Sequence, residues 1–248
     1  MKYILQHTHI YLYLCVDYSQ ERGYGFANST EQIKSLVKQY QKIVFEYYYE
    51  YSDGKFQIKG DNNDSTIYIT DKGQQLHDKL LLAVILLSGL PLRGTEYEPI
   101  QLVNRCSSSI VYPRQVYFEE HNLLFAIISN YSKTGLVKTT HYLQGILAEV
   151  FAMYHVFIKP TVGYIAYMIS KPPPPEAGMP QYKQDMKNFF ITTNFNDYLF
   201  MDLHGNHFTD TRIRDTFLEQ FSFNHDLRIT IGMWRHVSID MLDYAIFN

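Results

Sequence analysis

The feature that most constrains this chain is an apolar stretch that stops abruptly at an arginine, LLLAVILLSGLPLRGTEYEPIQL over residues 80–102. Its leucines and valine recur at helical spacing, which predicts a buried helix. Asp71 is a plausible N-cap of that helix with Gln74 three residues on, and Gly89 with Pro91 supplies the stop. The first charged side chain after the stop is therefore expected at the edge of the core.

That side chain is Arg93, and Glu96 follows it at the start of a second short helix. Taken alone, an arginine here can bond the last carbonyl groups of the helix and pair with Glu96 or Glu98. Two later cations give it further interest: Lys133 in NYSKTG and Arg235 in GMWRHVSID. Arginine and lysine are the side chains that bind phosphate groups, so these three positions are candidates for one site.

The chain before this stretch predicts a helical segment of its own. Ser29 and Gln32 form a capping-box pattern ahead of an amphipathic helix, and Asp53-Gly54 then breaks that helix. A polar loop or hairpin follows. We therefore expect an N-terminal helical segment over residues 1–70 and a main domain over residues 71–248.

Beyond residue 102 the apolar pattern changes to a period of two. It predicts short strands at residues 110–112, 116–119 and 123–129, and a further strand at 136–143. Lys133 falls in the turn before the last of these strands. The expected fold class is mainly α with a small three-stranded antiparallel sheet (α+β).

Helices are expected again in the C-terminal half. An apolar stretch over residues 146–158 predicts a buried helix that Lys159-Pro160 would close, with another helix over 161–170. Thr209 can cap a helix, and a last helix should run from about Met233 toward the C-terminus.

Composition narrows the function classes. With 248 residues and 46% hydrophobic side chains the chain can build a sizeable core, and a net charge of -3 gives no bulk attraction to nucleic acid, although a local basic pocket can persist. Cys15, Cys106 and the histidines lack metal-ligand spacing, so no metal or cofactor is expected. The apolar run over residues 80–90 is too short to span a bilayer. We expect an intracellular protein, nuclear if the source is eukaryotic.

The order of these elements and cations resembles the catalytic domain of tyrosine recombinases over roughly residues 75–240. GLPLRGTEYEPIQL resembles that family's G-x-R-x-x-E box, the turn Ser132-Lys133-Thr134-Gly135 resembles its K-x-G strand turn, and Trp234-Arg235-His236 resembles the R-H of its H-x-x-R-H. The boxes are most similar to the degenerate recombinase-like domains of fungal Crypton-type elements and telomere-linked helicase loci.

The resemblance implies a chemistry for each box. Strand cleavage by transesterification places extra negative charge on the non-bridging phosphate oxygens, and Arg93 with Arg235 would clamp them bidentately. Lys133 would be the general acid that protonates the leaving oxygen. His236 would match the family's histidine, and Glu96 would orient Arg93 or cap the neighbouring helix. Neither magnesium nor a nucleotide is needed, because a phosphotyrosine bond conserves the energy of the broken diester.

The chain also departs from the family pattern. The first histidine of H-x-x-R-H falls on Gly232, and the nucleophilic tyrosine of the family lies a few tens of residues beyond the second arginine, where this sequence has ended. Tyr244 is the only tyrosine downstream, and it lies too close to Arg235 on the same predicted helix to serve. The chain is therefore expected to be inactive in cleavage as written.

The sequence thus predicts a DNA-binding remnant or fragment of a mobile-element tyrosine recombinase. Its expected partner is double-stranded DNA, with a possible homo-oligomer on that DNA and no membrane. Two alternatives stay open: a non-catalytic protein-interaction module that keeps the fold but has lost DNA cleavage, and an unrelated α+β protein. The negative net charge, Gly232 and the missing tyrosine favour the interaction module.

Overall fold

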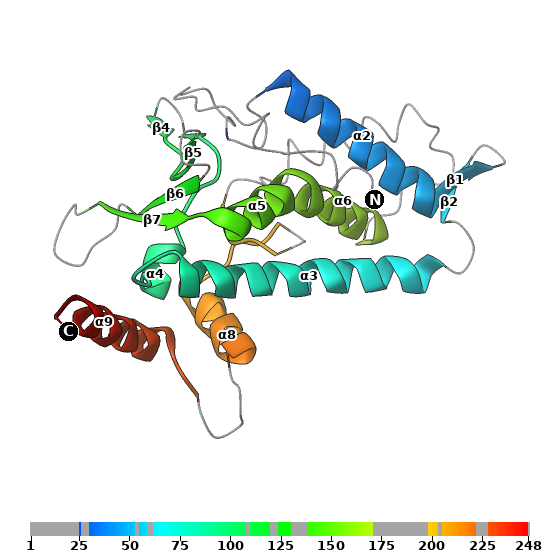
Figure 1. The fold of residues 1–248 in the computed structure, drawn as a ribbon. Helices are drawn as coiled ribbons and strands as arrows, with labels where there is room; N and C mark the ends of the chain where they lie inside the picture. Colours follow the sequence, from blue (N-terminus) through cyan, green and yellow to red (C-terminus); the bar gives the residue numbers. More distant parts are fainter. Residues whose placement is uncertain are drawn as a thin grey trace.

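A computed structural model shows a mostly helical chain with one three-stranded antiparallel sheet and two small hairpins, which confirms the predicted α+β class (Figure 1). The structure describes residues 25, 30–52, 55–58, 62–107, 110–119, 124–129, 138–170, 198–202, 205–221 and 228–247. The tetraproline at 172–175 lies outside these residues.

The helices are α2 (Glu31–Tyr48), α3 (Asn62–Leu87), α4 (Gly94–Tyr97), α5 (Gly145–Met153), the π-helical turn η3 (Tyr154–Ile158), α6 (Lys159–Ser170), α8 (Asp210–Phe221) and α9 (Ile231–Phe247). The strands are β1 (Tyr49–Ser52), β2 (Lys55–Ile58), β3 (Arg105–Ser107), β4 (Ile110–Tyr112), β5 (Val116–Glu119), β6 (Leu124–Ser129) and β7 (Thr139–Leu143). The predicted helix after Thr209 and the predicted last helix are both present.

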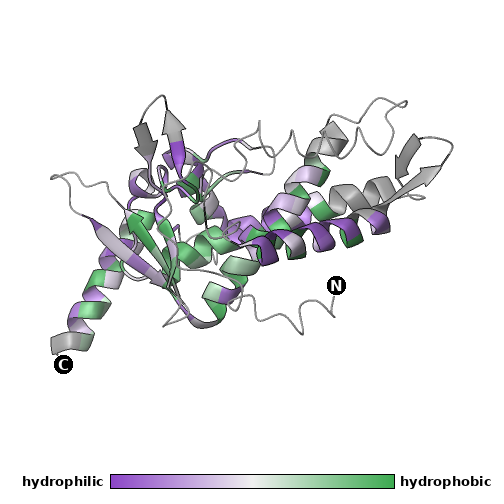
Figure 2. Cartoon of the chain, turned by 90° about the horizontal axis from the view of Figure 1, so that it is seen from above, coloured by the Kyte–Doolittle hydropathy of each residue, from purple (hydrophilic) through white to green (hydrophobic). Residues whose placement is uncertain are grey.

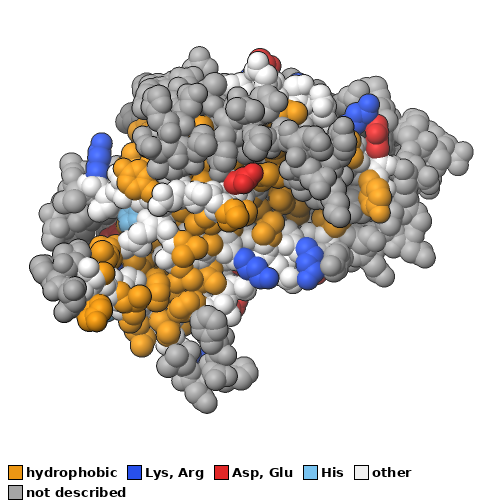
Figure 3. Space-filling model, viewed as in Figure 1, with side chains coloured by type: hydrophobic (Ala, Val, Ile, Leu, Met, Phe, Trp, Pro, Cys, Tyr) orange, Lys and Arg blue, Asp and Glu red, His pale blue; other side chains and the backbone are white. Residues whose placement is uncertain are grey.

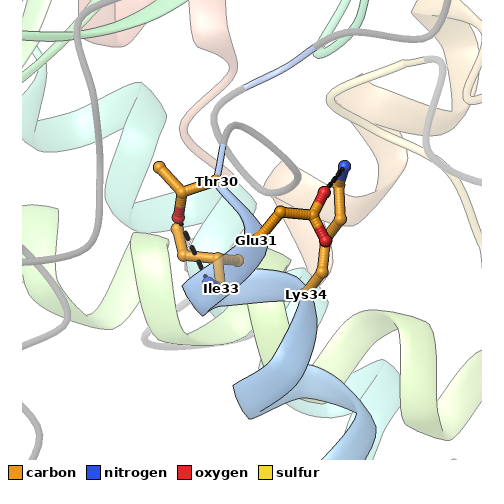
Figure 4. Close-up of polar contacts among 4 residues, drawn as sticks. All are labelled: Thr30, Glu31, Ile33 and Lys34. Atoms are coloured by element: carbon orange, nitrogen blue, oxygen red, sulfur yellow. Dashed lines mark hydrogen bonds and ion pairs between the residues drawn. The ribbon is translucent and has the colours of Figure 1, made fainter.

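The start of α2 shows how a local signal sets a helix boundary. The hydroxyl of Thr30 accepts the backbone N–H of Ile33 at 3.2 Å, and Lys34 pairs with Glu31 at 2.6 Å in the first turn (Figure 4). Thr30 therefore caps this helix by satisfying one of its free N–H groups. The predicted cap, Ser29, lies outside the described residues.

Helix α3 is longer than the sequence predicted. It runs for 26 residues from Asn62, so Asp71 lies inside the helix and its prediction as the N-cap was wrong. The predicted stop is confirmed: the helix ends at Leu87, and Gly89 takes a φ of 110°, a left-handed conformation that glycine adopts without strain. The expected division at residue 70 falls within α3, and it stays a prediction.

One helical segment carries α5, η3 and α6 without a break. The prediction that Lys159-Pro160 closes a helix was wrong. The backbone widens into a π-helical turn directly before Lys159, and Pro160 then lies in the first turn of α6, where a missing N–H is tolerated. Within this segment Gly145–Ala166 is long and apolar enough to cross a membrane, yet 61% of its most apolar window is buried inside the fold, as in a core helix.

The three-stranded sheet has the order β5-β6-β7, with both pairs antiparallel. Phe118 on β5 faces Phe125 on β6, and Phe125 faces Leu143 on β7. Phe125 also contacts Phe151 of α5, with 5.0 Å between ring centroids. The sheet therefore packs one apolar face against α5. The predicted strands at 110–112, 116–119 and 123–129 and the one before residue 143 are confirmed in their cores.

The core lies where the sheet meets the helices. Figure 1 shows α3 running below α5 and α6, with α2 above them and α8 beneath α3. Figure 2 shows hydrophobic colouring concentrated where the sheet adjoins the neighbouring helices. Leu81, Val84 and Ile85 of α3 are completely buried in this core. The buried end of α3 fixes the position of the turn that carries Arg93.

Candidate anion-binding site

Arg93 lies at the N-cap of α4, directly after the turn that ends α3. Its backbone N–H donates to Glu96 Oε2 at 2.8 Å, and its guanidinium lies 3.5 Å from Glu96 Oε1. The Arg93 side chain is 46% exposed, whereas that of Glu96 is only 8% exposed. The buried carboxylate therefore holds the backbone of Arg93 in place, and the guanidinium keeps access to solvent.

The N-terminal ends of α4 and α8 touch, and this contact fixes α4. A Cβ atom on Gly94 would lie 1.9 Å from Asp210 Oδ1, so a larger residue here would displace the Asp210 side chain. Asp210 pairs with Arg214 at 2.9 Å, and its backbone N–H donates to Glu98 Oε2 at 3.1 Å. The glycine after Arg93 therefore serves close helix packing.

A second arrangement ties the segment around residue 200 to the same region. Arg105 lies over the ring of Tyr198, which in turn stacks on His207 with 4.1 Å between centroids. The Nε2 atom of His207 is 2.6 Å from the carbonyl oxygen of Glu98. These contacts join residues about a hundred positions apart, so no local pattern in the sequence could predict them.

Arg235 comes to this region on α9. The hydroxyl of Thr230 caps that helix by accepting the N–H of Met233 at 3.1 Å, and Trp234 packs on Phe221 of α8, 5.6 Å between centroids. Arg235 is half-buried. It acts electrostatically on Tyr97 of α4, next to Glu96. Glu96 thus contacts Arg93, and Arg235 lies within electrostatic reach of Tyr97, the next residue, from a segment about 140 residues further along the sequence.

A buried histidine that the sequence analysis did not single out lies in the same neighbourhood. His141, on β7, is 6% exposed. Burial is the main cause that lowers the pKa of its imidazole; Glu96 and a hydrogen bond to the Ser88 backbone raise the pKa, and Arg235 lowers it. Burial also raises the pKa of the Tyr97 hydroxyl well above its usual range. The alternation of β7, which places His141 and Leu143 on one face, is the signal that could have identified this histidine.

We define the anion-site cluster as Arg93, Glu96, His141 and Arg235. Lys133 lies outside the described residues, between β6 and β7. Of the other predicted residues, His236 is exposed and follows Arg235 on α9, and Gly232 is exposed in the first turn of that helix.

Tyr244 lies on α9 together with Arg235 and is 72% exposed. Within the part of the chain that the structure describes, no group of three or more His, Cys, Asp or Glu side chains could hold a metal ion. The cluster therefore offers two guanidinium groups, one buried carboxylate and one buried imidazole. Such a set suits binding of an oxyanion through the guanidinium groups.

No protein family model, no curated protein and no solved structure matches this chain.

Proposed function

We propose that this chain binds the phosphate backbone of double-stranded DNA through Arg93 and Arg235. In this proposal the domain is a remnant or fragment of a mobile-element tyrosine recombinase. The observation that carries the proposal is that both arginines act at α4: Arg93 contacts Glu96, and Arg235 lies within electrostatic reach of Tyr97 and His141. The three-stranded sheet with the segment of Lys133 between its last two strands also agrees with the resemblance.

The chemistry of the proposal is binding without cleavage. A guanidinium presents a planar fork of N–H donors that matches two oxygens of one phosphate. Arg93, half-exposed and anchored through its backbone, can turn its fork outward while Glu96 keeps its base fixed. By resemblance, Lys133 and His236 would line the same phosphate. No nucleophile is assigned, so the proposal includes no covalent step.

The test is the binding of a labelled duplex DNA of arbitrary sequence, followed by fluorescence anisotropy over a range of salt concentrations. Arg93→Ala and Arg235→Ala should each weaken binding about tenfold, because each removes a charge-assisted contact. Each should also reduce the slope of log affinity against log salt by about 0.9, the contribution of one phosphate contact.

Two further variants sharpen this test. Arg93→Lys keeps the charge and loses the fork, so it should recover only part of the affinity. Lys42→Ala is the matched control: Lys42 lies on α2, where it pairs with Glu46 at 3.6 Å, and its loss removes one positive charge far from the cluster. Equal affinity and salt slope in the wild type and both alanine variants would refute the proposal.

A second candidate, the non-catalytic protein-interaction module, is favoured by an apolar surface. Figure 3 shows hydrophobic side chains gathered at the lower left of this face, over α9 and the region beside it. The large exposed hydrophobic residues of α9 are Met233, Val237, Met241, Leu242 and Tyr244. Apolar patches of this kind are typical of binding surfaces.

The two candidates give different results in one pair of measurements. If the chain is an interaction module, the wild type should bind no duplex DNA, and Met241→Lys should disrupt an assembly visible by sedimentation. If it binds DNA as proposed, Met241→Lys should bind short duplexes at least as tightly as the wild type, because it adds a positive charge on α9 and removes no group of the anion-site cluster.

A further inference from the structure

His141 joins two parts of the anion-site cluster. It lies on β7 opposite Ile127 of β6, and the next residue, Tyr142, donates its backbone N–H to the carbonyl oxygen of Ser88 at 3.2 Å. This bond ties β7 to the turn that leads from α3 to Arg93. His141 Nδ1 would lie 3.9 Å from a Cβ atom on Gly89, in the same turn. The imidazole is therefore packed against the base of the turn.

The imidazole is buried without full use of its hydrogen-bonding groups. Its Nε2 atom is inaccessible to solvent and has no hydrogen-bond partner among the residues that the structure describes. Such a nitrogen is uncommon in a folded protein, because buried polar atoms are normally paired. An interaction with the Ser88 backbone raises the pKa of this imidazole.

Among the described residues, two charged groups act on His141, and their effects are opposed. Glu96 of α4 favours its protonated form, Arg235 of α9 disfavours it, and burial disfavours it most. Tyr97 of α4 stays neutral at ordinary pH, and Ile127 on β6 is apolar. Together these influences favour the neutral form of His141. A change in the electrostatic field of Arg235 would therefore change the pKa of His141.

We propose that His141 couples proton uptake to anion binding at the Arg93–Arg235 site. This inference rests on the proposed function. A phosphate held by Arg235 cancels part of the positive field that opposes a proton on His141. Coupling between two binding events is reciprocal, so protonated His141 in turn strengthens phosphate binding. His141 is then a positioning and regulatory residue, since its buried ring acts through Arg235 and the Ser88 turn and does not touch the phosphate.

The first experiment follows the histidine rings of the wild-type chain, and a variant serves only to assign the signal of His141. Carbon-13 NMR of the histidine rings, titrated with and without a duplex of about 12 base pairs, follows each imidazole, and one signal is assigned to His141 by its loss in His141→Gln. We expect the pKa of His141 to rise when duplex is bound. An unchanged pKa in a saturated complex would overturn the inference.

The second experiment measures duplex affinity against pH. Wild-type affinity should rise about threefold to tenfold between about pH 7.5 and pH 5.5, and His141→Gln should lose most of this rise. His236→Gln is the control, because His236 is the exposed histidine beside Arg235. The pH dependence of affinity that remains in this variant does not come from His236. A pH dependence that is equal in wild type and His141→Gln would refute the coupling.

Failure of the inference differs from failure of the proposed function. If the arginine variants weaken DNA binding and His141→Gln changes nothing with pH, the DNA site stands and the coupling is wrong. If the wild type binds no duplex at any pH, the proposed function is wrong and the coupling falls with it.

Discussion

Two clusters of polar side chains involve α3, one beyond its C-terminal end and one around His77 in its middle, and they differ in their access to water. The anion-site cluster lies at the C-terminal end of α3, where Arg93 is 46% exposed. The second, which we call the core polar cluster, consists of His77, Tyr154, His155 and Lys159, all of them buried. Both contain histidines whose pKa burial lowers and a cation nearby.

The core polar cluster is closed by aromatic rings. His77 packs edge-on against Phe208 at 5.1 Å and lies 5.8 Å from Tyr154, and His155 lies 5.1 Å from Tyr154, all between ring centroids. Lys159 is completely buried and donates to the carbonyl oxygen of Tyr198 at 3.2 Å. A charge added here has no solvent to stabilise it.

The difference teaches what a histidine beside a cation can do. At the anion-site cluster, a bound anion can balance an added proton, so protonation of the histidine can strengthen anion binding. In the core cluster an added proton faces Lys159 within a closed aromatic shell, so titration acts on stability alone. Each substitution predicted below changes one of the two clusters or the packing beside it, and so tests whether the two clusters differ in function.

The largest expected effect is loss of stability in acid. Burial lowers the pKa of His77 and of His155, with Lys159 acting in the same direction on both. Both folded-state values lie below the unfolded value of about 6.5, so the unfolded chain takes up protons first as the pH falls. Stability is complete above about pH 6.5 and should decrease below it, by about 1.4 kcal/mol per pH unit for each histidine.

Urea unfolding at a series of pH values measures this slope. His77→Phe should reduce the slope by the share of one proton, because phenylalanine keeps a ring against Phe208 and cannot titrate. His236→Gln, at an exposed position, is the control. An acid slope that His77→Phe leaves unchanged would mean that the core cluster does not govern acid stability.

The next effect concerns the helix packing that positions the anion-site cluster. Gly94→Ala should destabilise the fold by about 1–3 kcal/mol, because its Cβ would meet Asp210 Oδ1 at 1.9 Å. Thermal or chemical unfolding measures the change. Asp210→Ala removes the two nearest atoms, so the penalty of Gly94→Ala should shrink in the double variant. Additive effects of the two substitutions would exclude this contact as the cause.

A smaller effect is expected at the helix that carries Arg235. Thr230→Ala removes the hydroxyl that accepts the N–H of Met233, which should cost about 1 kcal/mol of stability. It should also lower DNA affinity slightly by loosening the first turn of α9. Thr30→Ala, which removes the corresponding cap of α2, should cost a similar amount without any effect on DNA. Equal DNA affinities in the two variants would show that capping of α9 does not contribute to DNA binding.

The parts that the sequence predicted are those set by neighbouring residues. The end of α3 at Gly89, the short helix at Arg93 and the cap at Thr209 each depend on a few consecutive side chains. Asp71 was mistaken for a helix start because its capping pattern is local, while the helix continues to Asn62.

The site itself depends on long-range contacts that no local pattern encodes. His141 joins the cluster because β7 pairs with the Ser88 turn, about fifty residues away in the sequence, and Arg235 because α9 packs on α8 through Trp234. The resemblance to tyrosine recombinases selected Arg93 and Arg235 by their motifs, and it contains no motif for His141. The alternation of β7 marks His141 as an inward-facing residue, and the fold shows which residues it meets.

The smallest effect compares Glu96 of the anion-site cluster with Asp78, the carboxylate beside the core polar cluster. Glu96→Gln keeps an oxygen for the N–H of Arg93, which now lies 2.8 Å from Glu96 Oε2, and removes the negative charge beside the guanidinium. Duplex DNA affinity should rise about twofold to fivefold, because less of the positive field of Arg93 is cancelled. The pKa of His141 should fall, since Glu96 raises it.

Asp78→Asn is the matched control, because Asp78 stands beside His77 at 3.5 Å as Glu96 stands near His141. Its loss should lower the pKa of His77 further and leave duplex affinity unchanged. Anisotropy and histidine NMR read both results in one set of samples. If both variants raised DNA affinity equally, net charge alone would explain binding, and the two clusters would not differ in function.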